Sequence, residues 1–314
     1  MVKNFNDIVA LARQNDPIKI VVAAAQDESV LRGVHLAKKL NLIEVVLVGD
    51  QGKITDIINK HDLNFDDKDI IDIKDERQAC YKAFDMALAG KAEAVMKGKM
   101  DSGNFLGIVL DKKTGIKTDR LVSSVCLLED TGNNRILYLT DAVVNTHPNL
   151  QQKVEIVKNA VELVKVMGID KPKVAAISAS EFVTPNIPST IDAACLSKMA
   201  DRGQIQDAII DGPLALDNIL SFEAARKKGI NSPLCGEVDI LLAPNIETAN
   251  VIFKMWTHFV NENAIGVFLG TKVQTIQLPR ESPPEAKMVG IATTALMLNE
   301  RRKKWTISSC RLLS

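Results

Sequence analysis

The sequence predicts an α/β fold of two domains, built on mixed but mostly parallel sheets. Short Val/Ile/Ala-rich runs alternate with longer amphipathic segments along the chain, which is the pattern of strand–helix units in a parallel sheet. The length of 314 residues, at roughly 150 residues per domain, suggests two domains. Hydrophobic residues make up 46% and charged residues 25%, so a disordered or collagen-like chain is excluded.

Four buried strands are expected in the first part of the chain, each followed by a helix candidate. They are KIVVAAA at 19–25, EVVLVG at 44–49, DIIDI at 69–73 and AEAVMKG at 92–98. The segment 27–41 places its apolar side chains on one stripe, with Asp27 as the N-cap and Asn41 near the end.

An antiparallel hairpin and a second strand–helix series are expected next. The strands SSVCLLED at 123–130 and RILYLTDA at 135–142 flank turn residues, so the sheet should be mixed. A helix at 149–167 follows, and then the strands KVAAIS, QDAIIDG, DILLAP and AIGVFLG, separated by helices that end at Gly203, Gly229 and about Asn261. The last helix is expected at Pro283–Lys304, with a frayed or appended tail after it.

The domain division predicted from this order is 1–140 plus 266–314 for the first domain and 141–265 for the second. The boundary carries no Pro- or Ser-rich linker, so we expect a rigid hinge and an inter-domain cleft.

Charge and cysteine usage limit the possible partners and compartments. Thirty-nine basic residues balance 39 acidic ones, so the whole chain has no positive field to hold a nucleic acid. The five cysteines are scattered and never in CxxC spacing, which argues against disulfides and zinc and favours the reducing cytoplasm. A signal peptide and a membrane span are not expected, so we expect no membrane partner.

The loop after the fourth strand is the first candidate site. Lys97, Gly98, Lys99 and Ser102 stand where a strand passes into a helix, and glycine, free N–H groups and two lysines together could cradle a phosphate. The loop lacks the Walker A spacing, and an ordinary turn with exposed lysines explains it equally well.

Three polar residues of the second domain are further candidates for substrate binding. Asp141 and Asn145 follow the hairpin and could orient a ligand, although such residues before a helix are more often caps. Asn250 has no propensity reason to lie inside a helix. Asp217, by contrast, is explained as a helix cap.

Lys272, Arg280 and Ser282 lie between the last strand and the terminal helix. An arginine at a helix N-terminus adds donors to the attraction that the helix dipole exerts on an anion. The chain has no GxSxG elbow and no HExxH spacing, so neither a covalent serine mechanism nor a metal is indicated.

Several of these segments together resemble the phosphate butyryltransferases. The similar blocks are TPNIPSTIDAACLSKMADRGQIQDAIIDGPLALD at 184–217, MKGKMDSGNFLGIVLD, LTDAVVN, VDILLAPNIETAN and GTK near 270, within a resemblance that runs from about Val21 to Leu298. Phosphate acetyltransferases are more distant relatives. The resemblance implies an isocitrate/isopropylmalate dehydrogenase-like fold whose cleft holds acyl-CoA and inorganic phosphate, which exchange to acyl phosphate and CoA. It also implies a homo-oligomer that uses coenzyme A as substrate or product and needs no cofactor.

The resemblance also assigns catalytic residues. Where the family normally has Ser-Arg, this chain has Pro279-Arg280, so Arg280 is retained to bind the acyl carbonyl or phosphate. An Asp of the acetyltransferases is matched by Ala286, which leaves the neighbouring Glu285 as the candidate base for the CoA thiol, and a basic residue common in the family is matched by Gly107. These departures favour, as an alternative, an acyl-CoA-binding protein with weakened turnover. A nicotinamide-dependent dehydrogenase ranks lower, because no GxGxxG follows a strand.

Overall fold

The computed structural model describes residues 2–260 and 262–311, with side chains up to residue 303. The chain divides into two compact units. The split unit contains Phe5–Val122 and the residues from Ile265 onward, and the central unit contains Ser123–Ala264 with the first residues of the chain. The chain passes between the units at residue 123 and not near 140, because both strands of the hairpin belong to the central unit.

The split unit has a mixed sheet with the strand order β3-β2-β1-β4-β11-β10. Its strands are β1 (Ile18–Ala23), β2 (Ile43–Gly49), β3 (Ile70–Asp72), β4 (Ala94–Lys97), β10 (Ala264–Leu269) and β11 (Gln274–Ile276). All neighbours are parallel except β10 and β11, which run antiparallel. The carboxyl ends of β1, β4 and β11 therefore meet at one edge, where ligands of open α/β sheets bind.

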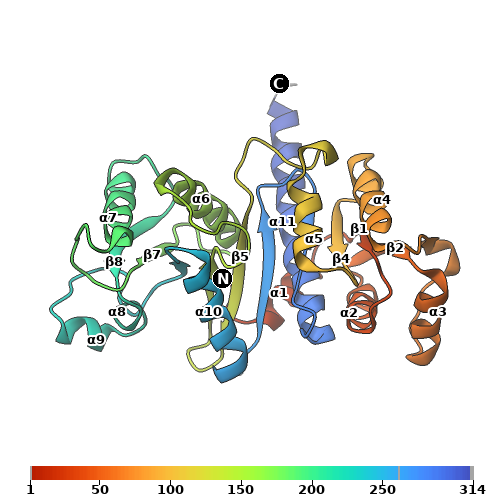
Figure 1. Ribbon diagram of the computed structural model, residues 1–314, viewed down its shortest axis with the longest axis horizontal. Coiled ribbons are helices and arrows are strands. Elements are labelled where there is room, and N and C mark those ends of the chain that lie inside the picture. Colours follow the sequence, from red (N-terminus) through yellow and green to blue (C-terminus); the bar gives the residue numbers. More distant parts are fainter. Residues whose placement is uncertain (1, 261, 312–314) are drawn as a thin grey trace. The chain divides into compact units, whose positions relative to one another are not determined.

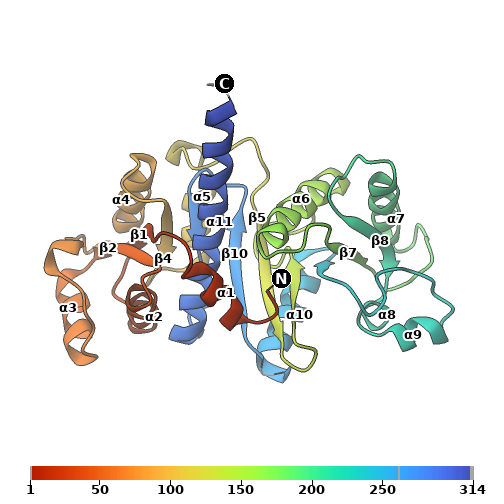
Figure 2. The ribbon, with the colours of Figure 1, turned by 180° about the vertical axis from the view of Figure 1, so that it is seen from behind.

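Helices cover both faces of this sheet (Figures 1 and 2). They are α1 (Phe5–Ala12), α2 (Glu28–Lys39), α3 (Gln51–Lys60), α4 (Glu76–Leu88), α5 (Ser102–Leu110) and α11 (Pro284–Arg311), with short 3-10 helices at Asp67–Asp69 and Lys112–Thr114. One hydrophobic cluster joins α4 and α5 to the sheet, and within it the Phe84 and Phe105 rings lie 5.7 Å apart. On the other face α11 packs against α2 and α1, which come from the opposite end of the sequence.

Two expectations for the split unit are corrected. Strand β11 was not anticipated, because its three residues, Gln274–Ile276, are mostly polar and it exists by pairing with β4. The terminal helix does not end near Lys304 but continues to Arg311. The added segment contains neither Gly nor Pro, so nothing in it breaks the helix.

The central unit has the strand order β5-β6-β9-β7-β8. Its strands are β5 (Ser123–Asp130), β6 (Arg135–Thr140), β7 (Lys173–Ile177), β8 (Ile209–Leu214) and β9 (Ile240–Leu242). The hairpin β5–β6 is antiparallel, as expected, and the other pairs are parallel. Its helices are α6 (Leu150–Val166), α7 (Pro188–Asp201), α8 (Leu216–Leu220), α9 (Phe222–Lys227) and α10 (Ile246–Met255), which continues as a π-helix over Trp256–Val260.

Local signals in the central unit are mostly confirmed. Asn149 caps α6 in a reciprocal capping box with Gln152. The glycines Gly203 and Gly229 adopt positive φ just after their helices, as C-terminal glycines do. Asp217 is not a cap: it lies inside α8, where its carboxylate pairs with Lys228 at 2.9 Å. The expected helix end at Asn261 lies outside the described residues.

Candidate active site

A small cavity of the split unit opens at the carboxyl ends of β4 and β11. Its volume is about 10 Å³, which is room for one water molecule. The lining residues come from the N-terminus of α2, the end of β4, the segment before α11 and α11 itself: Asp27, Val30, Met96, Lys97, Gly98, Leu278, Pro279, Arg280 and Lys287. Three cations and one carboxylate therefore surround a small polar space.

Glycine at position 98 is required by backbone packing. A Cβ added at Gly98 would lie 2.2 Å from the Ala24 carbonyl oxygen and 2.7 Å from that of Ala23. The Gly98 and Lys99 amides donate to those same two oxygens at 2.8 and 2.7 Å. The loop after β4 is thereby fixed on the end of β1, which determines where Lys97 lies.

Lys97 is buried at the end of β4, with only 4% of its surface exposed. Its ammonium donates to the carbonyl oxygens of Met100 at 3.0 Å and Gly98 at 3.4 Å. Burial lowers the pKa of Lys97, and the positive charge of Arg280 lowers it further, whereas Asp27 acts in the opposite direction. An anion bound at the open side of the cavity, where Arg280 is exposed, would relieve the repulsion between these cations.

Arg280 is exposed at this cavity, unlike the two lysines that line it. Within the described part of the chain its guanidinium has no hydrogen-bond or ion-pair partner. Its backbone is held, however, because the Lys287 ammonium donates to the Arg280 carbonyl oxygen at 3.4 Å. The five donors of the guanidinium are thus available to a carboxylate, phosphate or carbonyl oxygen.

The other residues expected around Arg280 have varied surroundings. Lys99 and Ser102 are exposed at the start of α5, and Ser102 is the residue after the Asp101 cap. Glu285 is exposed in the first turn of α11 and does not line the cavity. Ser282 contributes its backbone, since its carbonyl oxygen accepts from the Ser29 hydroxyl at 2.8 Å.

Lys272 belongs to a different, open pocket of the split unit. That pocket has a volume of about 640 Å³ and is lined by Lys112, Gly115, Lys117, Thr118, Asp119 and Lys272. Lys272 is exposed there and does not line the cavity of Lys97 and Arg280. Its binding role stays a prediction.

The three candidates of the central unit gather after β6. Asp141 is 3% exposed and accepts from the Ser124 hydroxyl, from the amides of the next turn and from the Asn145 side chain at 2.6 Å. Asn250 donates to the Ala142 carbonyl oxygen at 3.3 Å and so ties α10 to this turn. Asp141 therefore organises the loop, and the contacts of Asn250 explain why an asparagine lies inside the helix.

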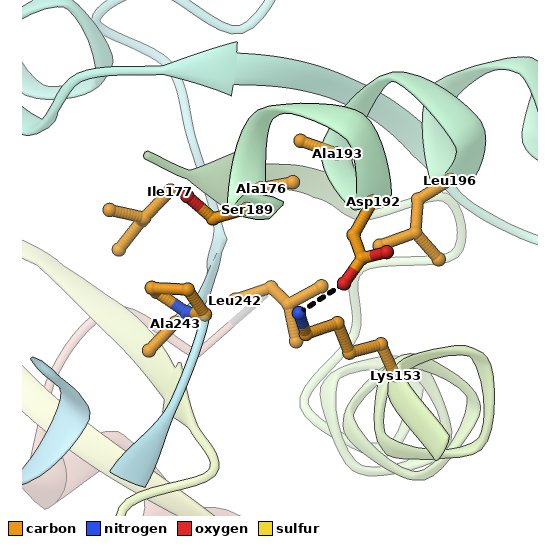
Figure 3. A pocket seen from close by; sticks show the side chains of 10 residues that line it. Lys153, Ala176, Ile177, Ser189, Asp192, Ala193, Leu196, Leu242 and Ala243 are labelled. Carbon is orange, nitrogen blue, oxygen red and sulfur yellow. Dashed lines mark hydrogen bonds and ion pairs between the residues drawn. The ribbon is translucent and has the colours of Figure 1, made fainter. Parts of the chain in front are cut away.

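A second small cavity lies in the central unit, at the ends of β7 and β9 (Figure 3). Its polar feature is an ion pair between Lys153 of α6 and Asp192 of α7, with the ammonium 2.7 Å from the carboxylate oxygen. Lys153 is 5% exposed, and the pair satisfies its charge within the protein.

Comparison with known proteins identifies the family. The family described as "Phosphate acetyl/butaryl transferase" matches residues 76–294. The chain belongs to this family. It is 41% identical over 301 residues to the phosphate butyryltransferase of Clostridium acetobutylicum, covering 96% of this chain and 100% of that protein. It is 42% identical over 297 residues to the phosphate butyryltransferase of Clostridium beijerinckii, covering 95% and 98% of the two chains.

Solved structures support the same assignment. A branched-chain phosphotransacylase from Enterococcus faecalis V583 superposes with a TM-score of 0.74 at 26% identity, over 89% of this chain and 99% of that one. The resemblance to the phosphate butyryltransferases is therefore confirmed, and with it the prediction that the chain is an acyltransferase enzyme with an α/β fold and a mixed sheet.

Sequence reasoning missed one residue of the cavity, Lys287. It is 2% exposed and stands in the first turns of α11, where a lysine normally faces water. A signal was present, because Lys287 is the one charged residue between Ala286 and Leu298. Asp27 was found only as a cap, and it does cap α2, accepting from the Val30 amide at 2.9 Å.

Proposed function

We propose that this member of the family is a phosphate acyltransferase that converts a short-chain acyl-CoA, butyryl- or branched-chain, and inorganic phosphate into acyl phosphate and CoA. The observation that carries the proposal is the cation cluster of Lys97, Lys287 and Arg280 around one cavity. The relatives' names, phosphate butyryltransferase and branched-chain phosphotransacylase, support the acyl group and the phosphate.

The chemistry requires an anion to approach a thioester. A phosphate oxygen attacks the carbonyl carbon, the carbonyl oxygen takes the negative charge, and the C–S bond then breaks to release the CoA thiolate. Phosphate is already a competent nucleophile, so the protein has mainly to position it and stabilise the oxyanion. In this proposal Arg280 does this with its unpaired donors, and Lys97 adds positive potential.

The reverse reaction needs a thiolate. A thiol of pKa near 8.5 is only a few per cent ionised at pH 7, so a carboxylate base that takes its proton speeds attack on the acyl phosphate. Glu285, exposed in the first turn of α11, is our candidate for this base. Lys99, Ser102, Asn145, Asn250, Lys272 and Ser282 stay proposed binding residues.

Finer features belong to the same proposal. We expect an isocitrate/isopropylmalate dehydrogenase-like arrangement with a cleft, a homo-oligomer, a cytoplasmic location suggested by the scattered cysteines, and no cofactor besides the substrate CoA. In the part of the chain that the structure describes, no helix is both long and apolar enough to cross a membrane.

The decisive assay follows the release of free CoA thiol from acetyl-, butyryl- and isobutyryl-CoA, with and without phosphate. Release that needs phosphate and is fastest for four-carbon chains is the expected result. Tight CoA binding in calorimetry without phosphate-dependent release of thiol would instead favour a binding protein with weakened turnover. The residue that motivates this alternative is Pro279, which stands where the resemblance leads us to expect a serine.

A further inference from the structure

The Lys287 ammonium donates its hydrogen bonds to the segment that carries Arg280. It donates to the carbonyl oxygens of Ser282 at 2.9 Å, Pro279 at 3.2 Å and Arg280 at 3.4 Å. An ammonium has three protons, so these three carbonyls match its donor capacity. Backbone carbonyls of an irregular segment need such partners, because no strand or helix satisfies them.

Helix α2 encloses the stem of this lysine. A Cβ added at Gly33 would lie 2.7 Å from the Lys287 Cβ, so the two helices are in close backbone contact at this point. From the same helix the Ser29 hydroxyl donates to the Ser282 carbonyl oxygen, which therefore has both Ser29 and Lys287 as donors. The segment before α11 is thus held by Ser29 of α2 and by Lys287 together.

A buried charge at this position carries a desolvation cost, which the three hydrogen bonds of the ammonium offset. Burial lowers the pKa of Lys287, while Asp27 and Glu281 partly offset that effect. An apolar side chain of similar length would avoid the cost of desolvating the ammonium. The benefit of the lysine is the fixed path of residues 279–282.

We infer that Lys287 is a positioning residue: by holding the Pro279, Arg280 and Ser282 carbonyls, it fixes the backbone from which the Arg280 guanidinium reaches phosphate or the acyl group. The inference rests on the proposed function.

The test is a double-mutant cycle with Lys287→Met and Arg280→Ala, measured as kcat/KM for phosphate. If Lys287 acts through Arg280, Lys287→Met lowers kcat/KM by about 30-fold or more in the wild-type background but by less than about threefold in the Arg280→Ala background, because misplacing a group costs nothing once the group is gone. Losses that multiply in full, or an unchanged kcat/KM in Lys287→Met, would overturn the inference.

Two further variants separate positioning from loss of folding. Lys287→Arg keeps the charge and its donors and should recover part of the activity, and it replaces Lys287→Met in the cycle if that protein does not fold. Asn299→Ala is the matched control on α11: its side chain holds the Asp16 carbonyl oxygen at 3.2 Å, so its loss loosens the helix without touching residues 279–282. It should leave kcat/KM for phosphate within about twofold.

A readout without turnover distinguishes this inference from the proposed function. The Ser282 amide donates to the Pro279 carbonyl oxygen at 3.2 Å, and its hydrogen exchange should accelerate in Lys287→Met and remain slow in Asn299→Ala. If the wild-type protein lacks phosphate-dependent thiol release, the proposed function fails, and the exchange result still decides whether Lys287 orders the segment. Unchanged exchange there would overturn the positioning role.

Discussion

Arg280 combines an exposed side chain with a backbone that the protein holds firmly. Because its guanidinium has no partner among the described residues, Arg280→Ala should leave the free energy of unfolding within about 0.5 kcal/mol of wild type. Turnover should fall by about 10²–10³-fold, as when one donor to a developing oxyanion is removed. Denaturant unfolding and the thiol-release assay measure the two effects, and a near-normal rate would remove Arg280 from the site.

The buried Lys97 makes phosphate binding sensitive to alkaline pH. Burial, followed by the charge of Arg280, lowers the pKa of Lys97, so it loses its proton at a lower pH than an ordinary lysine. Its attraction for phosphate is present below that pKa and is lost as the pH rises through it. We expect KM for phosphate to increase on the alkaline side.

Lys97→Arg is the variant that checks this prediction, because a guanidinium stays charged over the whole range. The part of the alkaline increase due to Lys97 should disappear, and a smaller increase from Lys287, whose pKa is lowered too, should remain. An identical pH profile for the two proteins would show that Lys97 does not face the phosphate.

At this scale the sequence could place Lys97 and Arg280 but not Lys287. Lys97 ends strand β4 and Arg280 follows strand β11, at the carboxyl ends of strands, where ligands of parallel sheets bind. Lys287 acts through contacts with three carbonyl oxygens of the irregular segment before α11, and the path of that segment cannot be predicted from residue pattern. For Asp141 the sequence predicts either a residue that orients a ligand or a cap. Its oxygens accept from the amides of its own turn, and a role toward a ligand stays a prediction.

At the scale of elements, two glycines provide a matched pair of substitutions: Gly98 in the loop after β4 and Gly107 inside α5. Gly98→Ala places a Cβ 2.2 Å from the Ala24 carbonyl oxygen, so the backbone must move and stability should fall by about 1–3 kcal/mol. Gly107→Ala, inside α5 with nothing within 4 Å of the added Cβ, should stabilise by about 0.5–1 kcal/mol.

Urea unfolding measures the change in the free energy of unfolding for each of the two variants. Only Gly98→Ala should also lower activity, because the loop that carries Lys97 would shift. A neutral Gly98→Ala would mean that the ends of β1 and β4 are less closely joined than the hydrogen bonds of this loop indicate.

Strands with a nearly continuous apolar sequence could be predicted, whereas a strand that exists only because it pairs with its neighbours could not. The strand runs at 44–49 and 123–130 match β2 and β5 closely, because buried strands are nearly continuous apolar segments. Strand β11 reads as polar, since two of its three residues are Gln274 and Thr275, and its pairing with β4 and β10 gives it a register. Such a strand is a property of the tertiary structure.

For the whole molecule, the buried thiols provide a measure of global opening. Burial raises the pKa of Cys80 to about 12, and the pKa of Cys126 is also raised, mainly by burial. Both are inert as long as each unit stays closed, because the reactive species is the thiolate. We expect a thiol reagent to label these two residues at the rate of unfolding.

Mass spectrometry of labelled peptides checks this, with the unfolded protein as the reference for full reaction. Cys195, which is half-buried, serves as the internal comparison and should be labelled earlier. Rapid labelling of Cys80 in the native protein would show local opening of α4, where it packs between the helix and the sheet.

The chain enters the split unit, leaves it at residue 122 and returns only at Ile265. During synthesis the segment with Lys97 is therefore made long before the segment with Arg280 and Lys287. Strand β4 cannot pair with β11 until that later segment has been synthesised. The central unit, by contrast, is encoded in nearly one stretch and can be completed first. A ribosome-bound chain short of Ile265 contains one cation of the cavity and lacks the other two. The cavity is thus one of the last features the growing protein can acquire, and a product truncated before Arg280 should be unable to bind phosphate there.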